Sequence, residues 1–214
     1  MNVRLVRYTQ EPLRTIIDAY RKAHKSEEKS DTTCETIGPK DEALISKCIR
    51  LGHHSPLEFV DFEFEITMSK VADRQLCRHR LSSFVGESMR HVEPEDYYVP
   101  LTIMRSVPAI EKFIEVMKAS FKGYYELMNL GIPMEDARYV LPLATNGSFL
   151  YKANLRSLRN AIAERTCKTA QTEIREMFFK IKELVAQVQP IFLYRSEKFW
   201  ICENKCGMCN GVIR

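Results

Sequence analysis

Residues 57–67, LEFVDFEFEIT, contain the alternation that decides the fold class. Apolar side chains recur close to a period of two, with acidic residues between them, at Phe59, Phe62, Phe64 and Ile66. Successive side chains of a strand point to opposite faces, so this pattern is typical of a strand buried on one face only. We therefore predict a half-buried strand here, and further strands over residues 3–8 and 144–152.

The segments around this strand favour helices. Pro12 suits the first turn of a helix running to about residue 24. A second helix is expected over 41–51, with Asp41 as N-cap and Gly52 as stop signal, and a third from 69 to about 82, with Ser69 as cap. Long helices are expected over 108–130 and over 154–189, the latter with Asn154 as cap, and a short one over MEDARYVL after Pro133. We predict an α+β fold: a helix-dominated single domain (1–200) with a small antiparallel-rich sheet and a long C-terminal helix. Residues 25–40 are expected to form a flexible or ligand-covering loop, and 201–214 a Cys-rich tail.

Composition narrows the class of protein. Hydrophobic residues make up 45% and charged residues 28% of the 214, which is typical of a globular protein in water. No apolar run approaches the roughly 18 residues that cross a bilayer, and the N-terminus does not read as a signal peptide. Seven cysteines, an odd count, argue against a secreted disulfide framework. We expect a cytoplasmic protein with reduced thiols and no membrane partner.

The positive charge is mild but rich in arginine. The net charge is +4, and 17 of the 32 basic residues are arginine. Arginine favours two-pronged recognition of phosphate and carboxylate, which suggests small anionic ligands. A basic nucleic-acid-binding module is the alternative from another class, because arginines cluster around 74–80 and 156–165. No nucleic-acid-reading motif is recognisable, so we expect no such partner.

The densest polar cluster is DRQLCRHR at 73–80, followed by LSSFVGESMR at 81–90. On a helix, Gln75, Arg78 and His79 would share a face, whereas Arg78 and Arg80 would lie about 200° apart at roughly 100° per residue. Two arginines could therefore serve two ligands. A solvated basic face fits the residue types equally well.

The sequence Arg78-His79-Arg80, followed after seven residues by Ser88, resembles the signature of the flavin-dependent thymidylate synthases. Three more segments resemble blocks of that family in the same order: GHHSPLE at 52–58, ARYVLPL at 137–143, and NLRSL at 154–158 with Asn160 and Arg165. Together they span residues 52–165, over half the chain. One such motif is weak evidence, but four in order are strong.

The resemblance implies which residues bind which ligand. The implied FAD-binding residues are His53, Ser55, Glu58, Arg78, His79, Arg80, Asn154, Arg156 and Asn160. The implied dUMP-binding residues are Gln75, Arg78, Glu87, Ser88, Arg90, Arg138 and Arg165, and the implied catalytic residues are His53, Ser88 and Arg165. Arginine forks and hydroxyl donors suit a nucleotide phosphate, and an amide or guanidinium suits a uracil edge.

The resemblance also implies a reaction and an assembly. The reaction is reductive methylation of dUMP to dTMP, with methylenetetrahydrofolate as carbon donor, reduced FAD as hydride source and NADPH to regenerate it. The implied assembly is a homotetramer with shared active sites. None of the eight glycines forms a G-x-G-x-x-G or Walker loop, so side chains must bind FAD in place of a glycine-rich cradle.

The chain departs from the family pattern near Ser88. Many members read Asn-Glu-x-Ser there, but this chain reads Val85-Gly86-Glu87-Ser88, which displaces the acid by one residue. In a strand, a shift of one residue turns a side chain to the opposite face. His91 stands where the family often has tyrosine, and Phe59 where histidine is common. Methylation of UMP or another pyrimidine nucleotide is therefore the alternative prediction.

Two cysteine features have competing interpretations. Cys77, beside Arg78 and His79, could be an activated nucleophile, but Asp73 and Leu81 do not form a base and an orienting group for it, so a structural thiol is expected. The tail has C-x3-C-x2-C spacing at Cys202, Cys206 and Cys209, which suits a metal or iron–sulfur cluster. We expect no metal, with a metal shared with another chain as the alternative.

Overall fold

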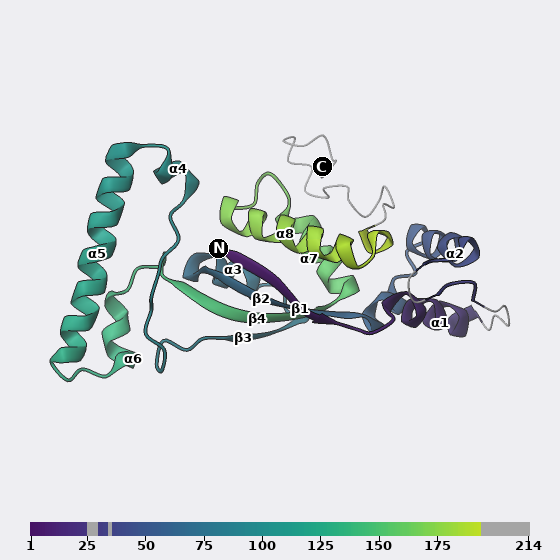
Figure 1. Ribbon diagram of the computed structural model, residues 1–214, viewed down its shortest axis with the longest axis horizontal. Helices are drawn as coiled ribbons and strands as arrows, with labels where there is room; N and C mark the ends of the chain where they lie inside the picture. The colour runs from purple at the N-terminus through teal and green to yellow at the C-terminus, as the bar shows by residue number, and fades with distance from the viewer. Residues whose placement is uncertain (25–29, 34–35, 194–214) are drawn as a thin grey trace.

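A four-stranded antiparallel sheet organises the chain in this computed structural model, which describes residues 1–24, 30–33 and 36–193 (Figure 1). The strand order is β1-β2-β4-β3. The strands are β1 (Asn2–Tyr8), β2 (Asp61–Ser69), β3 (Ser82–Gly86) and β4 (Asn146–Asn154). Helices α7 (Leu155–Arg165) and α8 (Thr172–Val188) lie along the sheet. The predicted α+β fold with a small antiparallel sheet is confirmed.

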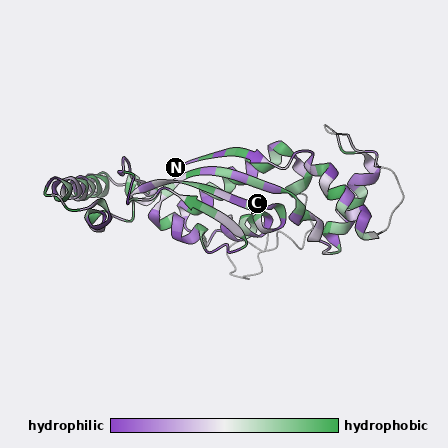
Figure 2. Ribbon diagram, turned by 90° about the horizontal axis from the view of Figure 1, so that it is seen from below, coloured by the Kyte–Doolittle hydropathy of each residue, from purple (hydrophilic) through white to green (hydrophobic). Residues whose placement is uncertain are grey.

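The remaining helices extend the molecule at both ends of the sheet. At one end lie α1 (Pro12–His24) and α2 (Pro39–Arg50), and at the other lie α5 (Val107–Asn129) and α6 (Met134–Ala137), as Figures 1 and 2 both show. The shorter elements are η1 (Ser55–Phe59), α3 (Lys70–Leu76), α4 (Leu101–Met104), η2 (Arg138–Val140) and η3 (Pro190–Leu193). None of the helices within the described ranges is long and apolar enough to cross a membrane.

The alternation of β2 divides the sheet into a dry and a wet face. Its apolar side chains Phe62, Phe64, Ile66 and Met68 are completely buried. The acids between them form cross-strand ion pairs on the other face: Asp61 with Lys152 at 3.0 Å, Glu63 with Arg7 at 2.5 Å, and Glu65 with Arg4 at 2.7 Å. On the dry face, α8 buries Met177, Phe178, Ile181 and Val185, as its helical spacing predicts.

Three predicted helix boundaries are confirmed by their capping contacts. The Ser69 hydroxyl accepts a hydrogen bond from the Ala72 amide at 3.2 Å, and the Asn154 side-chain oxygen Oδ1 accepts one from the Ser157 amide at 2.9 Å. Gly52 ends α2 with a φ of 82°, a left-handed conformation that favours glycine. The His53 amide then donates to the Cys48 carbonyl at 2.9 Å, which completes a Schellman turn.

The predicted strand at 57–67 and helix at 69–82 both have wrong boundaries. Residues 55–59 form η1, because Pro56 fixes its own φ and cannot donate to a strand, and Phe59 is 67% exposed. Helix α3 ends at Leu76, where the His79 amide closes a tight turn on the Leu76 carbonyl at 3.1 Å. The residues that follow form β3, a strand that was not predicted.

The predicted single helix over 154–189 is two helices. The break at 166–171 is stabilised locally, since the Thr166 hydroxyl donates to the Ile162 carbonyl at 2.7 Å and ends α7. The Arg175 guanidinium satisfies the Lys168 carbonyl at 3.0 Å inside the break. The turn sends α8 back along the sheet in place of a longer α7.

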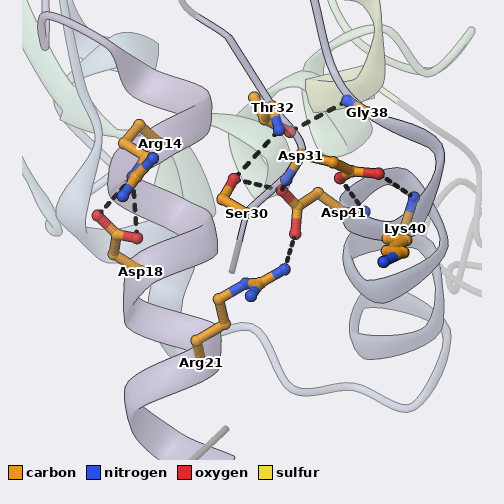
Figure 3. A network of polar contacts seen from close by, with 9 residues as sticks. All are labelled: Arg14, Asp18, Arg21, Ser30, Asp31, Thr32, Gly38, Lys40 and Asp41. Atoms are coloured by element: carbon orange, nitrogen blue, oxygen red, sulfur yellow. Dashed lines mark hydrogen bonds and ion pairs between the residues drawn. The ribbon is translucent and has the colours of Figure 1, made fainter. Parts of the chain in front are cut away.

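Asp41 is not the N-cap of α2; Gly38 occupies that position and the helix begins at Pro39. Asp41 is fully buried and accepts hydrogen bonds from Arg21 and Ser30, each at 2.5 Å (Figure 3). Asp31 caps α2 instead, through the Lys40 amide at 3.0 Å and the Asp41 amide at 3.2 Å. This Arg21–Asp41 network anchors residues 30–33 of the predicted loop; 25–29 and 34–35 lie outside the described residues.

Candidate active site

Three of the resembling segments meet at one end of the sheet, which we call the donor end (residues 53–58, 78–82 and 154–160). The register pairs Asp61 with Asn154 and Ser82 with Ala153, so η1, the turn after α3 and the start of α7 converge there. The Leu155 amide also donates to the Val60 carbonyl at 2.7 Å. Segments that are about a hundred residues apart in sequence thus become neighbours.

The donor end presents side chains that suit a phosphate-bearing cofactor. Its exposed polar residues are His53, Ser55, Glu58, Arg78, Arg80, Arg156 and Asn160. Arg156 and Asn160 are one turn apart on α7, as predicted. Arg156 pairs with Glu58 at 2.5 Å, a partly exposed contact that leaves further guanidinium donors available. Arginines, an amide and a hydroxyl are the groups that bind phosphates and ring heteroatoms, so this donor set fits FAD.

Two of the implied cofactor residues are less available than the others. The Asn154 side-chain oxygen Oδ1 already accepts the capping hydrogen bond of α7. The His79 side chain is only 12% exposed, and its ring centroid lies 5.8 Å from that of Phe178. His79 therefore faces inward from the turn after α3, toward Phe178 of α8.

Arg165, at the end of α7, gathers a second set of implied residues, which we call the Arg165 cluster (Gln75, His79, Arg165 and Gln171). Its Nε donates to His79 Nε2 at 2.9 Å and its Nη2 donates to the Gln75 carbonyl at 3.1 Å. The Gln75 side-chain amide donates to Gln171 Oε1. Burial, and next the charge of Arg165, lower the pKa of His79 to about 4. His79 is therefore neutral near pH 7.

The remaining substrate-binding candidates lie beyond the far end of β3. The Glu87 amide donates to the Ser148 carbonyl at 2.9 Å, and the Glu87 carboxylate accepts from the Ser148 amide at 2.8 Å. Arg90 donates to the Glu135 carboxylate at 2.8 Å, and Arg138 Nε to the Glu135 carbonyl at 3.0 Å. A cleft of about 250 Å³ opens beside them, lined by residues that include Lys70, Glu87, Glu93, Asp96 and Asn146.

The structure does not bring all the implied substrate residues together in one chain. Gln75, Arg78 and Arg165 form a first group, and Glu87, Ser88, Arg90 and Arg138 form a second. The five residues of β3, roughly 17 Å of strand, separate the Arg78 turn from Glu87. Within the described part of the chain, no hydrogen bond or ion pair joins the two groups. A complete pocket is therefore not formed by these residues of one copy.

The geometry gives little support to a protein nucleophile at Cys77 or at Ser88. The Cys77 thiol donates to Asp73 at 3.3 Å, and burial together with that carboxylate raises its pKa to about 11. A thiol held in its protonated form is a poor nucleophile, which supports the structural interpretation. The Ser88 hydroxyl accepts from the Arg90 amide at 3.3 Å, and among the described contacts no histidine ring nitrogen is hydrogen-bonded to it; His91 contacts Ser88 only through its backbone amide. The tail cysteines lie outside the described residues.

Sequence reasoning missed three polar residues near these sites, of which Glu173 and Arg159 are buried and Gln171 is exposed. Glu173 accepts hydrogen bonds from the Ser69 amide at 2.8 Å and the Ser69 hydroxyl at 2.6 Å, which ties α8 to the start of α3. Arg159 is fully buried in α7 and donates to the Phe192 carbonyl at 2.9 Å. Gln171 contacts Gln75. These contacts span from 33 to 104 residues, so no local pattern could reveal them.

Comparison with known proteins places this geometry in a family. Residues 4–191 match the Thy1 family, described as thymidylate synthase complementing protein. Over 213 residues the chain is 37% identical to a flavin-dependent thymidylate synthase of Sulfurisphaera tokodaii, an alignment that covers 95% of this chain and 81% of the relative. The chain belongs to the flavin-dependent thymidylate synthase family. A Pyrococcus furiosus member is 32% identical over 230 residues, covering 100% and 94%.

A solved structure shares the fold of this flavin-dependent thymidylate synthase family member. It is the UMP/dUMP methylase PolB from Streptomyces cacaoi bound with 5-Br dUMP, at 24% identity and a TM-score of 0.79, covering 89% of this chain and 92% of that one. The likeness shows that the small sheet and its covering helices form a recurrent framework. The individual residue roles, the homotetramer, the co-substrates NADPH and folate, and the cytoplasmic location stay predictions.

Proposed function

We propose that this chain catalyses the reductive methylation of dUMP to dTMP, with methylenetetrahydrofolate as carbon donor, reduced FAD as hydride source and NADPH as the reductant of FAD. Family membership supports the reaction class. The observation that carries the proposal within the structure is Arg165. Its guanidinium contacts His79 of the family signature and is fixed by that neutral imidazole and by the Gln75 backbone carbonyl. Its positive charge is therefore available to an electron-rich ligand.

The donor end would bind FAD, which supplies a hydride when bound and reduced. Arg78, Arg80 and Arg156 are exposed and suit its phosphates. Smaller polar side chains lie near these arginines: those of His53, Ser55, Glu58, Asn154 and Asn160. The His79 side chain, by contrast, is largely buried. Because no glycine-rich loop is present, orientation of the ring system must come from these side chains and from the fixed backbone of η1 and α7.

The two groups of substrate-binding candidates would contact different parts of the nucleotide. Arg165, Gln75 and Arg78 suit the uracil, since a cation near a ring carbonyl stabilises negative charge that develops on the pyrimidine. Arg90, Arg138 and the Ser88 hydroxyl suit the phosphate. Arg90 contacts Glu135 here, and this partly exposed pair can open for a better anion. Glu87 would contribute through its position beside β4.

Separation of the two groups supports a site shared between chains of a homotetramer. The arm formed by α5, α6 and η2 also exposes apolar side chains, including Val107 at 69%, Leu130 at 79% and Tyr139 at 84%. Apolar side chains exposed along such an arm would be removed from water if the arm packed against another chain. Light scattering of the full chain should give four times the protomer mass. A monomer with full activity would contradict the shared site.

The first test is flavin binding and its response to nucleotide. The purified chain should retain a flavin absorbance spectrum after incubation with FAD and desalting, and anaerobic NADPH should bleach it at a rate that responds to dUMP. Arg78→Ala should lose the flavin, and Arg138→Ala should keep it but bind dUMP more weakly. Arg14→Ala, an exposed arginine on α1, is the matched control and should change neither. A protein that never binds flavin would refute the proposal.

Methylation of UMP is the second candidate, because Glu87 is displaced by one residue from the family pattern and its carboxylate is held by the Ser148 amide. A changed acid beside the substrate could alter the preference for a ribose 2′-hydroxyl. The ratio of kcat/KM for dUMP and UMP measures that preference. We expect dUMP to be preferred, and a ratio below one would make UMP the substrate.

A further inference from the structure

The His79 side chain is hydrogen-bonded to Arg165 and not to an exposed residue of the donor end, among the contacts of the described residues. Its Nε2 lies 2.9 Å from Arg165 Nε, and its Nδ1 lies 3.9 Å from the Glu164 carboxylate on the same helix. Its ring packs against Phe178 of α8. The turn after α3 thus places an imidazole, 12% exposed, against the end of α7.

The chemistry of this contact fixes the tautomer. A guanidinium N–H can only donate, so His79 Nε2 must be the unprotonated acceptor and Nδ1 must carry the proton. Nδ1 lies 3.9 Å from the 64% exposed Glu164 carboxylate, and a negative charge on that side favours the same tautomer. Phe178 brings no charge to the ring, and within the described residues the charged groups with a contact to it are Arg165 and Glu164.

We propose that His79 is a positioning residue: the neutral imidazole accepts a hydrogen bond from Arg165 Nε and, with the Gln75 carbonyl, orients the guanidinium so that its other donors serve the substrate. This inference rests on the proposed function for the role of Arg165. It assigns His79 a task other than the cofactor binding that the family resemblance implies. A carboxylate at position 79 would neutralise Arg165, whereas a neutral imidazole orients it and leaves its charge intact.

The tautomer can be measured without any activity. Imidazole ¹⁵N NMR of the full chain at pH 7, without ligands, should show one of the five histidines with a protonated Nδ1 and an unprotonated Nε2. That signal should be absent in His79→Gln, and it should titrate only near pH 4, since burial and then Arg165 lower the pKa of His79. In Arg165→Gln the midpoint should rise. A protonated Nε2 at pH 7 would overturn the proposal.

Kinetics then separate positioning from cofactor binding. His79→Gln places an amide oxygen near the Nε2 position and should keep kcat within about threefold. His79→Phe keeps the ring against Phe178 but removes the acceptor, and should lower kcat about 100-fold, the usual cost of losing one organised electrostatic contact, with FAD affinity within twofold. The same His79→Phe change in an Arg165→Gln background should cost little more, because it acts through the arginine.

The alternative outcomes are distinct. If His79→Phe chiefly weakens FAD binding, or if its loss multiplies with that of Arg165→Gln, His79 acts on the cofactor and the proposal is wrong. If the unmodified chain forms no dTMP, the proposed function fails, while the NMR tautomer still decides the His79–Arg165 contact. Should His79→Phe not fold, the NMR result and His79→Gln decide the matter alone.

Discussion

Arg21 and Arg165 are both fixed by hydrogen bonds, but their partners carry different charge. Arg21 lies on α1 and donates to the carboxylate of Asp41 on α2 at 2.5 Å (Figure 3). Arg165 ends α7 and donates to a neutral imidazole and a backbone carbonyl. In the described ranges, no carboxylate forms an ion pair with Arg165. One arginine is neutralised and the other keeps its charge.

The difference matches the surroundings of the two residues. The Arg21 and Asp41 side chains are 9% and 0% exposed, so their pairing offsets the cost of removing two charges from water and connects α1, α2 and residues 30–33. Arg165 is partly buried and contacts His79 of the family signature. The partner of an arginine, more than the arginine itself, therefore separates a structural role from a ligand-binding role in this chain.

The largest expected effect concerns Arg165. Arg165→Gln keeps a polar side chain but removes the charge, so kcat for dTMP formation should fall about 10²- to 10³-fold. The free energy of unfolding should change by less than about 1 kcal/mol, because no buried ion pair is broken. Steady-state kinetics and urea denaturation on one preparation measure both. A stability loss comparable to the activity loss would erase the contrast with Arg21.

The opposite pattern is expected at Asp41. Asp41→Ala leaves the buried Arg21 guanidinium without its carboxylate and frees Ser30, which should lower the free energy of unfolding by about 3 kcal/mol. The value of kcat/KM per folded molecule should stay within about twofold. Urea denaturation measures the first quantity, and kinetics normalised to flavin content measure the second. A stable but inactive variant would show that this network belongs to the active site.

The same contrast explains what the sequence could reveal. The alternation at Phe62, Phe64 and Ile66 is a local pattern, and it correctly predicted a half-buried strand. Local caps at Ser69, Asn154 and Gly52 were also predictable. Asp41 was misread as an N-cap because the capping rule is local, whereas its real partner Arg21 lies 20 residues away. A long-range pair outweighed a local preference.

The candidate site follows the same division. The residues that the family motifs assign to FAD lie near one another at the donor end, because each motif is short and the sheet register brings the segments together; their role in binding stays a prediction. The Glu173–Ser69 contact could not be predicted, because its two residues are 104 positions apart. The break between α7 and α8 was missed although its contacts are local, because helical spacing does not register the hydrogen bonds that Thr166 and Arg175 make with backbone carbonyls. Helical spacing also grouped Arg78 and His79 with Gln75 on one face, but α3 ends before them, and Arg165 makes the connection.

Lowering the pH should remove the electrostatic stabilisation that the Arg21–Asp41 pair provides. Burial alone would raise the pKa of Asp41, but hydrogen bonds from Ser30, Arg21 and Thr32 and the charge of Arg21 lower it to about 2. The pKa is thus lower in the folded chain than in the unfolded chain, so the stabilisation is complete above about pH 4 and is lost as pH falls toward 2. It amounts to about 2 kcal/mol.

The measurement is the free energy of unfolding of the chain and of Asp41→Asn at several values between pH 6 and pH 3. The difference between the two proteins should shrink as the pH falls, because only the unmodified chain loses a carboxylate charge at this position. A constant difference across that range would mean that packing, and not the charge of Asp41, stabilises the junction of α1 and α2.

The smallest change in stability is expected for Arg14 and Asp18, an arginine–aspartate pair that is exposed to solvent. Arg14 donates to Asp18 at 3.0 Å one turn along α1, and both side chains are about half exposed. Water already solvates these charges, so Asp18→Ala should shift the denaturation midpoint by no more than replicate error, and added salt should remove any residual shift. Asp18→Ala is therefore the matched control for Asp41→Ala. If the two variants lost equal stability, burial would not explain the strength of the Arg21–Asp41 network. Burial of a charged partner would then not distinguish the structural role of Arg21 from the role of Arg165.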